Sequence, residues 1–321
     1  MGDPPPAALT GNVLSTPSGV AFSVVGTTSN GGAWLKVTNV SPTPGTFSAS
    51  IDPTVLSTLA PGSYVGSLSL LGTGIVLSVT LCVTAAGGPK INPYGVVPVY
   101  NTRPTIQPGS WISIYGDQLA PSTAVWQGDF PTSLNGVTVT VNGKPGYLWF
   151  VSPGQINVQA PDDMTMGPVT VAVTTPTGTT VSTVGLSPES PSFSLLDSKH
   201  IAAIVINADG SYSIVGPAGA FPYATRPVSA GENLVLYGVG FGPTADQVPA
   251  GQAYGSATPT TGPVPVTIGG MPAQVSFVGL VGAGLYQINV TVPAGLASGD
   301  QPVAAMVGQF PSGVGPVITI K

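Results

Sequence analysis

Glycine and proline constrain this chain more than any other feature of its sequence. The 321 residues include 44 glycines and 35 prolines, and one or the other interrupts almost every short window. No stretch keeps apolar residues at helical spacing, whereas short runs rich in Val, Thr, Ile and aromatic residues recur along the chain. The sequence therefore predicts an all-β protein, with a single turn of helix near Asp52–Leu59.

The composition separates this chain from disordered ones. Hydrophobic residues make up 42% of it, charged residues only 6%, and the net charge is −5. Disorder pairs low hydrophobicity with high net charge, so folded domains with many tight turns fit better. A chain of 321 residues exceeds the size at which a single core stops growing, which indicates two or three domains.

The first domain is expected within residues 1–86, followed by a short Gly- and Pro-containing linker at 87–91. Turn residues separate five strand-like runs at the regular spacing that is typical of a β-sandwich. The runs are Ala21–Val25, Trp34–Asn39, Thr46–Ile51, Ser63–Leu71 and Ile75–Val83.

The rest of the chain contains an internal repeat. Pro108–Gly116 matches Ala230–Gly238, and Gln155–Val158 matches Gln287–Val290. The second copy is about ten residues longer between the two motifs, and its Gly-rich stretch Gly238–Gly262 can hold the excess. A repeat this long duplicates a whole domain, so residues 92–190 and 191–321 are expected to form two related modules. The prediction is three tandem Ig-like β-sandwich modules.

Two resemblances follow from these motifs. Trp34–Val37 and Leu59–Gly66 resemble the BACON domain family, Ig-like sandwiches of secreted bacterial proteins proposed to bind carbohydrate or mucin, although many members look like spacers. Ile114–Ala120, Gln155–Pro161 and Leu236–Pro243 resemble the Solibacter-type uncharacterised C-terminal domain family of exported acidobacterial proteins, and more distantly the IPT/TIG branch of Ig-like folds. The second resemblance implies a place and a fold more than an activity.

The charge distribution limits the partners. Seven Lys and Arg residues form no basic patch, which argues against nucleic acid, and no apolar run approaches the length of a membrane span. The start, Met1-Gly2-Asp3 followed by prolines, resembles a start that follows a removed signal peptide. We expect an extracellular or cell-surface location.

Few residues offer catalytic or metal chemistry. The single histidine, His200, is expected to be exposed or at a strand edge without an acid beside it, and the single cysteine, Cys82, to be a strand residue. One Cys and one His cannot supply a usual zinc site. Asp209, Asp162 and Asp163 are weak calcium candidates, and no cofactor is expected. The sequence predicts a protein that is not an enzyme.

Aromatic residues are the remaining candidates for a binding site. Trp126 lies in a polar loop and is the best candidate to stack on a sugar ring, while Tyr223 and Tyr254, in loops of the third module, are lesser ones. Trp111 and Trp149 alternate within strands and are expected in the core. The amides of the two Gln-Ile-Asn-Val motifs are expected to cap neighbouring loop backbone.

Two functions stay open. The first is a non-enzymatic secreted or cell-surface scaffold or adhesion protein, with self-assembly into a layer or filament as a variant. The alternative is an extracellular carbohydrate-binding protein. The corresponding partners are other surface proteins, further copies of this chain, or an extracellular polysaccharide.

Overall fold

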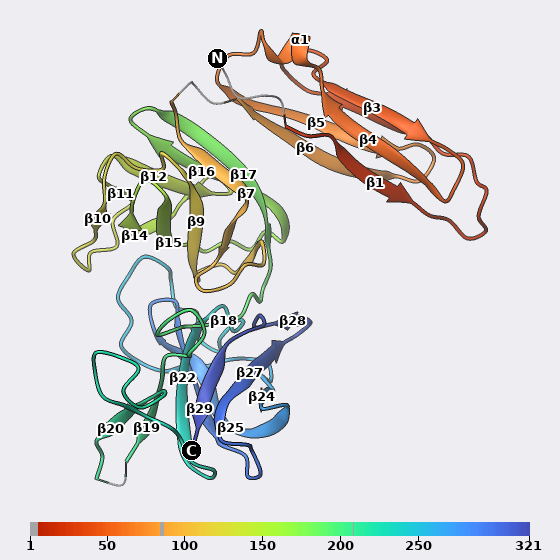
Figure 1. The fold of residues 1–321 in the computed structure, drawn as a ribbon. Coiled ribbons are helices and arrows are strands. Elements are labelled where there is room, and N and C mark those ends of the chain that lie inside the picture. The colour runs from red at the N-terminus through yellow and green to blue at the C-terminus, as the bar shows by residue number, and fades with distance from the viewer. Residues whose placement is uncertain (1–5, 84–86, 208) are drawn as a thin grey trace. The chain divides into compact units, whose positions relative to one another are not determined.

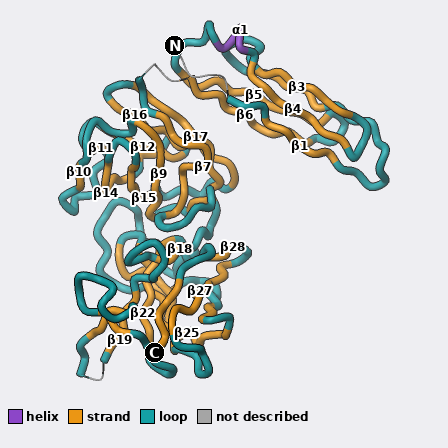
Figure 2. Tube along the Cα trace, viewed as in Figure 1, coloured by secondary structure: helices purple, strands orange, loops and turns teal. Residues whose placement is uncertain are grey.

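The computed structural model describes residues 6–83, 87–207 and 209–321. Its regular secondary structure is almost entirely strand, joined by many turns and loops, and the described residues contain one helical turn, α1 (Pro53–Leu56), as predicted (Figures 1 and 2). Asp52 caps this turn by accepting a hydrogen bond from the Thr54 N–H at 2.8 Å, and Pro53 opens it. The all-β prediction is therefore confirmed. Residues 1–3, interpreted above as the start that follows a removed signal peptide, lie outside the described residues.

The chain divides into two compact units, residues 1–89 with 177–182, and residues 90–176 with 183–321. No helix in the described ranges is both long and apolar enough to cross a membrane. Each unit is described separately below.

The first unit is a sandwich of two three-stranded antiparallel sheets. One sheet contains, in spatial order, β1 (Leu9–Val13), β4 (Gly45–Ile51) and β3 (Leu35–Val40); the other contains β2 (Val24–Thr28), β5 (Gly62–Leu70) and β6 (Ile75–Val83). Its core surrounds Trp34, which is fully buried and donates its indole N–H to the Asn30 carbonyl at 3.0 Å. A buried indole with a hydrogen-bond partner anchors a core strongly, because its large apolar area is buried without an unpaired donor.

The second unit begins with a larger sandwich. A five-stranded sheet contains, in spatial order, β10 (Ala124–Val125), β14 (Tyr147–Val151), β15 (Gln155–Gln159), β9 (Trp111–Asp117) and β7 (Lys90–Pro98). The facing sheet contains β11 (Ser133–Leu134), β12 (Val137–Val141), β16 (Gly167–Thr175), β17 (Gly178–Leu186) and β8 (Thr105–Ile106), with β13 (Lys144–Pro145) paired to β12. Alternate residues of both sheets fill one fully buried aliphatic core.

The remaining strands form one continuous sheet folded around a second core. Its principal path runs through β21 (Thr225–Arg226), β20 (Tyr212–Val215), β19 (Ala203–Ile206), β22 (Asn233–Val239), β26 (Leu285–Thr291), β25 (Met271–Gly282), β24 (Val266–Ile268), β27 (Gly299–Val307) and β28 (Phe310–Pro311). Three short strands pair beside this path: β18 (Ser192–Phe193), β23 (Thr258–Pro259) and β29 (Val317–Ile320). The long strand β25 pairs first with β24 and then with β26, which joins the two layers.

The same strand pairing occurs at both copies of the repeated sequence motifs. β9 pairs with β15 so that Tyr115 lies opposite Gln155, and β22 pairs with β26 so that Tyr237 lies opposite Gln287. Both β14 and β25 carry a bulge at the same point of the repeat. The sequence motifs therefore mark equivalent strands in two related folds.

The longer loop of the repeat's second copy fastens onto the first copy. Gly242 donates its N–H to Gln107 Oε1 at 2.9 Å, Ala250 donates to Asp162 Oδ2 at 3.0 Å, and Gly251 donates to Gln159 Oε1 at 3.0 Å. All three donors lie within residues 238–262, the stretch that was expected to contain the additional residues of the second copy. The extra residues thus hold the two parts of the second unit together.

Candidate functional site

Four aromatic rings gather on the outer face of the five-stranded sheet. Trp111 is central, with its ring centroid 5.6 Å from that of Trp126, 5.9 Å from that of Trp149 and 6.4 Å from that of Phe130. The rings of Trp126 and Phe130 meet edge to face at 4.6 Å. All four side chains are only partly buried. The rings therefore support one another while leaving apolar surface open to solvent.

Strand alternation explains why these rings face outward. Ile112 and Ile114 on β9, and Ile156 and Val158 on β15, fill the inner core, so Trp111 must point to the opposite face. The prediction that Trp111 and Trp149 belong to the core is wrong, because aliphatic side chains already occupy that space. Trp126 does reach this surface, although the neighbouring rings cover part of it.

A row of amides continues the aromatic surface. Asn157 Oδ1 accepts hydrogen bonds from Ser113 Oγ at 2.9 Å and from Gln155 Nε2 at 2.8 Å. The predicted role, capping of loop backbone, is wrong for this pair, since the amides bond along their own strand. Within the described chain, Asn157 Nδ2 and Gln155 Oε1 have no protein partner, so a donor and an acceptor remain at the surface.

Two tyrosines lie beyond the amides. Tyr100 and Tyr115 are 48% and 39% exposed. Burial and, secondly, the Tyr115 phenol raise the pKa of Tyr100. The outer face thus combines exposed rings with neutral hydrogen-bonding groups. We call Trp111, Trp126, Phe130, Trp149, Gln155 and Asn157 the aromatic–amide face.

The second copy of the repeat keeps the amides and lacks the rings. Gln287 Nε2 donates to Asn289 Oδ1 at 2.9 Å, as in the first copy. The strand register, however, places Asn233 at the position of Trp111 and Ser276 at the bulge position of Trp149. The amide row is therefore common to the repeat fold, whereas the aromatic surface is particular to the first copy.

The other predicted aromatic candidates lie elsewhere. Tyr223 is 41% exposed and its ring stacks on Phe221, with centroids 5.3 Å apart and planes 18° apart. Tyr254 is half-buried and packs against the core of the third module. The structure does not bring either residue to the aromatic–amide face.

His200 differs from its prediction. It is only 6% exposed, and its Nδ1 and Nε2 lie 2.7 Å from Asp197 Oδ2 and 3.3 Å from Asp300 Oδ2. The expectation of an exposed histidine without an acid beside it is wrong. Asp197 also accepts the backbone N–H groups of Lys199 and His200, which folds this segment so that ring and carboxylate meet.

This cluster has the wrong arrangement for a hydrolytic triad. A triad histidine needs one ring nitrogen on an acid and the other on a nucleophile. Both nitrogens of His200 face carboxylates, and the Thr319 hydroxyl donates to Asp300 Oδ1 at 2.8 Å. The cluster instead joins the segment before β19 to β27 and β29.

The three calcium candidates are occupied by protein hydrogen bonds. Asp163 accepts the Thr165 N–H and the Asn142 amide, both at 2.9 Å, and these bonds hold the pKa of its carboxyl far below the usual range. Asp162 binds the Ala250 N–H, and Asp209 accepts the N–H and hydroxyl of Ser211. No group of three or more His, Cys, Asp or Glu residues in the described ranges could hold a metal ion.

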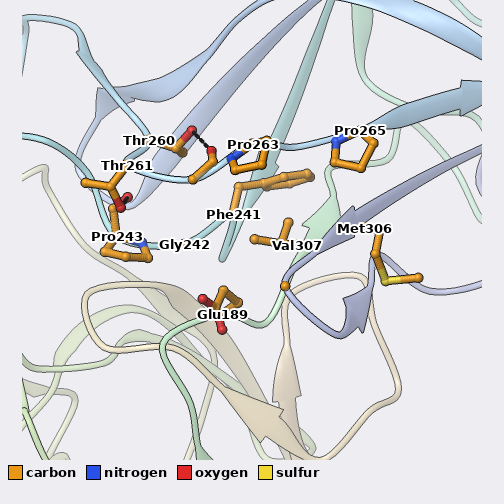
Figure 3. A pocket seen from close by; sticks show the side chains of 12 residues that line it. Glu189, Phe241, Gly242, Pro243, Thr260, Thr261, Pro263, Pro265, Met306 and Val307 are labelled. Atoms are coloured by element: carbon orange, nitrogen blue, oxygen red, sulfur yellow. Dashed lines mark hydrogen bonds between the residues drawn. The ribbon is translucent and has the colours of Figure 1, made fainter.

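A pocket of about 330 Å³ lies beside β27 and carries little chemistry. Figure 3 shows its lining, in which Phe241, Val307 and Pro263 are apolar and Glu189 supplies the carboxylate. The Thr260 hydroxyl donates to the Gly262 carbonyl at 3.0 Å. No nucleophile lies beside a base among these residues, so the aromatic–amide face remains the stronger candidate.

Comparisons with known proteins give weak similarities only. No protein-family model and no curated protein matches the chain. SGBP-B of the Bacteroides ovatus mixed-linkage glucan utilization locus, solved with a mixed-linkage heptasaccharide, is 13% identical with a TM-score of 0.35, over 98% of this chain and 64% of that one. Extracellular domains 3–5 of Drosophila OTK are 12% identical with a TM-score of 0.19, over 98% and 92% of the two chains. This chain therefore spans less than two thirds of the SGBP-B chain, and such TM-scores carry no argument about function.

Proposed function

We propose that this chain is a non-catalytic extracellular binding protein that recognises a neutral polysaccharide with the aromatic–amide face. The observation that carries the proposal is the juxtaposition of partly exposed tryptophans with surface amides. The apolar face of a sugar ring stacks on an indole, and its hydroxyls pair with amide donors and acceptors. Asn157 Nδ2 and Gln155 Oε1 are such a donor and acceptor.

The charge pattern supports a neutral ligand. The six residues of the face include no Lys or Arg, and the whole chain carries a net charge of −5. An acidic polysaccharide would gain no cationic partner there and would meet long-range repulsion. Binding is therefore expected to change little between low and high salt.

The resemblances to the BACON and Solibacter-type families support the proposal that this chain is a bacterial protein exported from the cell. Exported proteins of this kind work outside the cell, where polysaccharide is an accessible ligand. Adhesion through bound glycan would join the scaffold and carbohydrate-binding hypotheses in one function.

The test uses the internal repeat as its control. Affinity electrophoresis or calorimetry against neutral plant, fungal and bacterial polysaccharides should show binding that Trp126→Ala and Trp149→Ser each weaken about tenfold. Serine is the residue that the second copy carries at the position of Trp149, so this change suits the fold. Asn157→Ala should also weaken binding, whereas Asn289→Ala, the same change in the ring-free copy, should not.

Two results would refute the proposal. One is the absence of binding to any neutral polysaccharide by the correctly folded full chain. The other is equal loss of affinity in the Asn157 and Asn289 variants, or in a variant of the distant exposed Tyr212, which would place binding elsewhere.

A further inference from the structure

Strand β6 presents an open edge in the first unit. It pairs with β5 over nine residues without a bulge, from Gly62 opposite Val83 to Leu70 opposite Ile75. In the order β2-β5-β6 it is the outermost strand, and no other described strand pairs with its second edge. The backbone groups along that edge are therefore available to another strand.

This edge lacks the features that usually prevent strand addition. Folded proteins protect edges by keeping the strand short, or with charges, proline or bulges. The edge strands β1 and β2 are only five residues long and β3 carries Lys36, whereas β6 runs for nine residues, IVLSVTLCV, without a charge or a proline. Ile75, Val76 and Leu77 are 52%, 60% and 52% exposed. Because neighbouring residues alternate, apolar side chains are open on both faces of the strand.

The sequence of β6 is nearly symmetric about Val79. Ser78 corresponds to Thr80, Leu77 to Leu81, Val76 to Cys82 and Ile75 to Val83. When two identical strands pair antiparallel about a two-fold axis at Val79, each residue lies opposite a similar one. An unrelated partner strand would not require this symmetry, so it indicates a second copy of the same strand.

We propose that two copies of this chain associate through β6, pairing antiparallel about Val79 into one six-stranded sheet. On the inner face, the exposed Leu77 of each copy then lies opposite Leu81 of the other and extends the core. On the outer face, Cys82 lies opposite Val76 of the second copy. This association goes beyond the proposed polysaccharide binding and uses a different part of the chain.

Disulfide trapping tests the register. In the full-length protein, Val76→Cys places a new thiol opposite Cys82 of the other copy, and mild oxidation should give a covalent dimer. Leu77→Cys is the control, since this neighbouring and equally exposed residue points to the opposite face from Cys82. It should give at least tenfold less covalent dimer at the same protein concentration.

Sedimentation of the reduced protein tests the association itself. The unmodified chain should dimerise with rising concentration, and Val76→Lys should weaken the dimer at least tenfold, because two lysines would flank an apolar edge. Val65→Lys adds the same charge to an exposed site on the central strand β5 and should leave the dimer intact. Monomers at every concentration, equal effects of the two lysines, or equal trapping by both cysteines would each overturn the proposal.

Discussion

Replacement of Gln107 by leucine tests how strongly the two copies of the repeat are coupled. The Gln107 side chain is 6% exposed and pairs reciprocally with the Gly242 backbone: Oε1 accepts its N–H at 2.9 Å and Nε2 faces its carbonyl at 3.4 Å. Nε2 also donates to the Tyr286 hydroxyl at 2.9 Å, and that hydroxyl donates to the Gly242 carbonyl. Burial raises the pKa of Tyr286 to about 12, so its proton stays in place at neutral pH.

The expected cost follows from these bonds. Leucine keeps the size of the side chain but leaves the buried Gly242 N–H without a partner, while the Gly242 carbonyl keeps the Tyr286 hydroxyl. An unpaired buried donor costs about 1–3 kcal/mol, and loss of the bond to Tyr286 adds about 1 kcal/mol. The free energy of unfolding of the second unit should therefore fall by roughly 2–4 kcal/mol.

Denaturant unfolding followed by tryptophan fluorescence measures this loss. Three of the four tryptophans, at positions 111, 126 and 149, lie in the second unit, so the signal reports chiefly on that unit. Gln247→Leu is the matched control, because Gln247 is exposed and lines, together with Gln107, a pocket of about 170 Å³. It should change stability by less than about 0.5 kcal/mol. Equal effects of the two substitutions would refute the coupling argument.

Two further changes test other parts of the structure. Gly240→Ala should destabilise the second unit by more than about 3 kcal/mol in the same assay, because φ is +75° and a Cβ would lie 2.0 Å from the Ser190 carbonyl oxygen. Gly231→Ala, with φ of +82° and open space around the Cβ, should cost only about 1 kcal/mol; similar losses would contradict the steric argument. Burial alone would raise the pKa of Asp197, but hydrogen bonds from His200 and Lys199 lower it to about 2. A lowered folded-state pKa means that its stabilisation is complete above about pH 4 and is lost as pH falls towards 2. Asp197→Asn should therefore reduce the acid dependence of stability in that range, and an unchanged acid profile would refute this assignment.

The fold followed from the sequence because its signals are local or repeated. Turn residues separate alternating runs, and the Gln-Ile-Asn-Val motif occurs at the same strand position in both copies. Even the helical turn at Asp52–Leu59 had a local cause, since an Asp-Pro pair both caps and opens a helix.

The site was less predictable because it depends on pairing between distant strands. Alternation along the strand shows that the side chains of Trp111 and Ile112 point to opposite faces of the sheet. Only the pairing with β15 shows that aliphatic side chains fill the inner face, so that Trp111 lies on the outer one. The Asp197 contact of His200 could have been read from the sequence, since the two are three residues apart. The Asp300 contact spans 100 positions and leaves no local signal.

The contacts that join the two copies of the repeat also reach the aromatic–amide face. Gly251, in the longer loop of the second copy, adopts φ of +80°, and a Cβ there would lie 2.1 Å from the Tyr147 ring. The same loop bonds Gln159, which lies opposite both Trp111 and Tyr147 in the sheet, and Trp111 donates its indole N–H to the Ala283 carbonyl at 2.7 Å. The second copy thus covers the part of the outer face formed by Trp111, Gln159 and Tyr147, and the rest of that face remains open. The second copy therefore fixes the inner ring, Trp111, through the turn between β25 and β26, while its longer loop packs against the neighbouring Tyr147 and Gln159. The remaining rings lie beyond this covered part of the sheet.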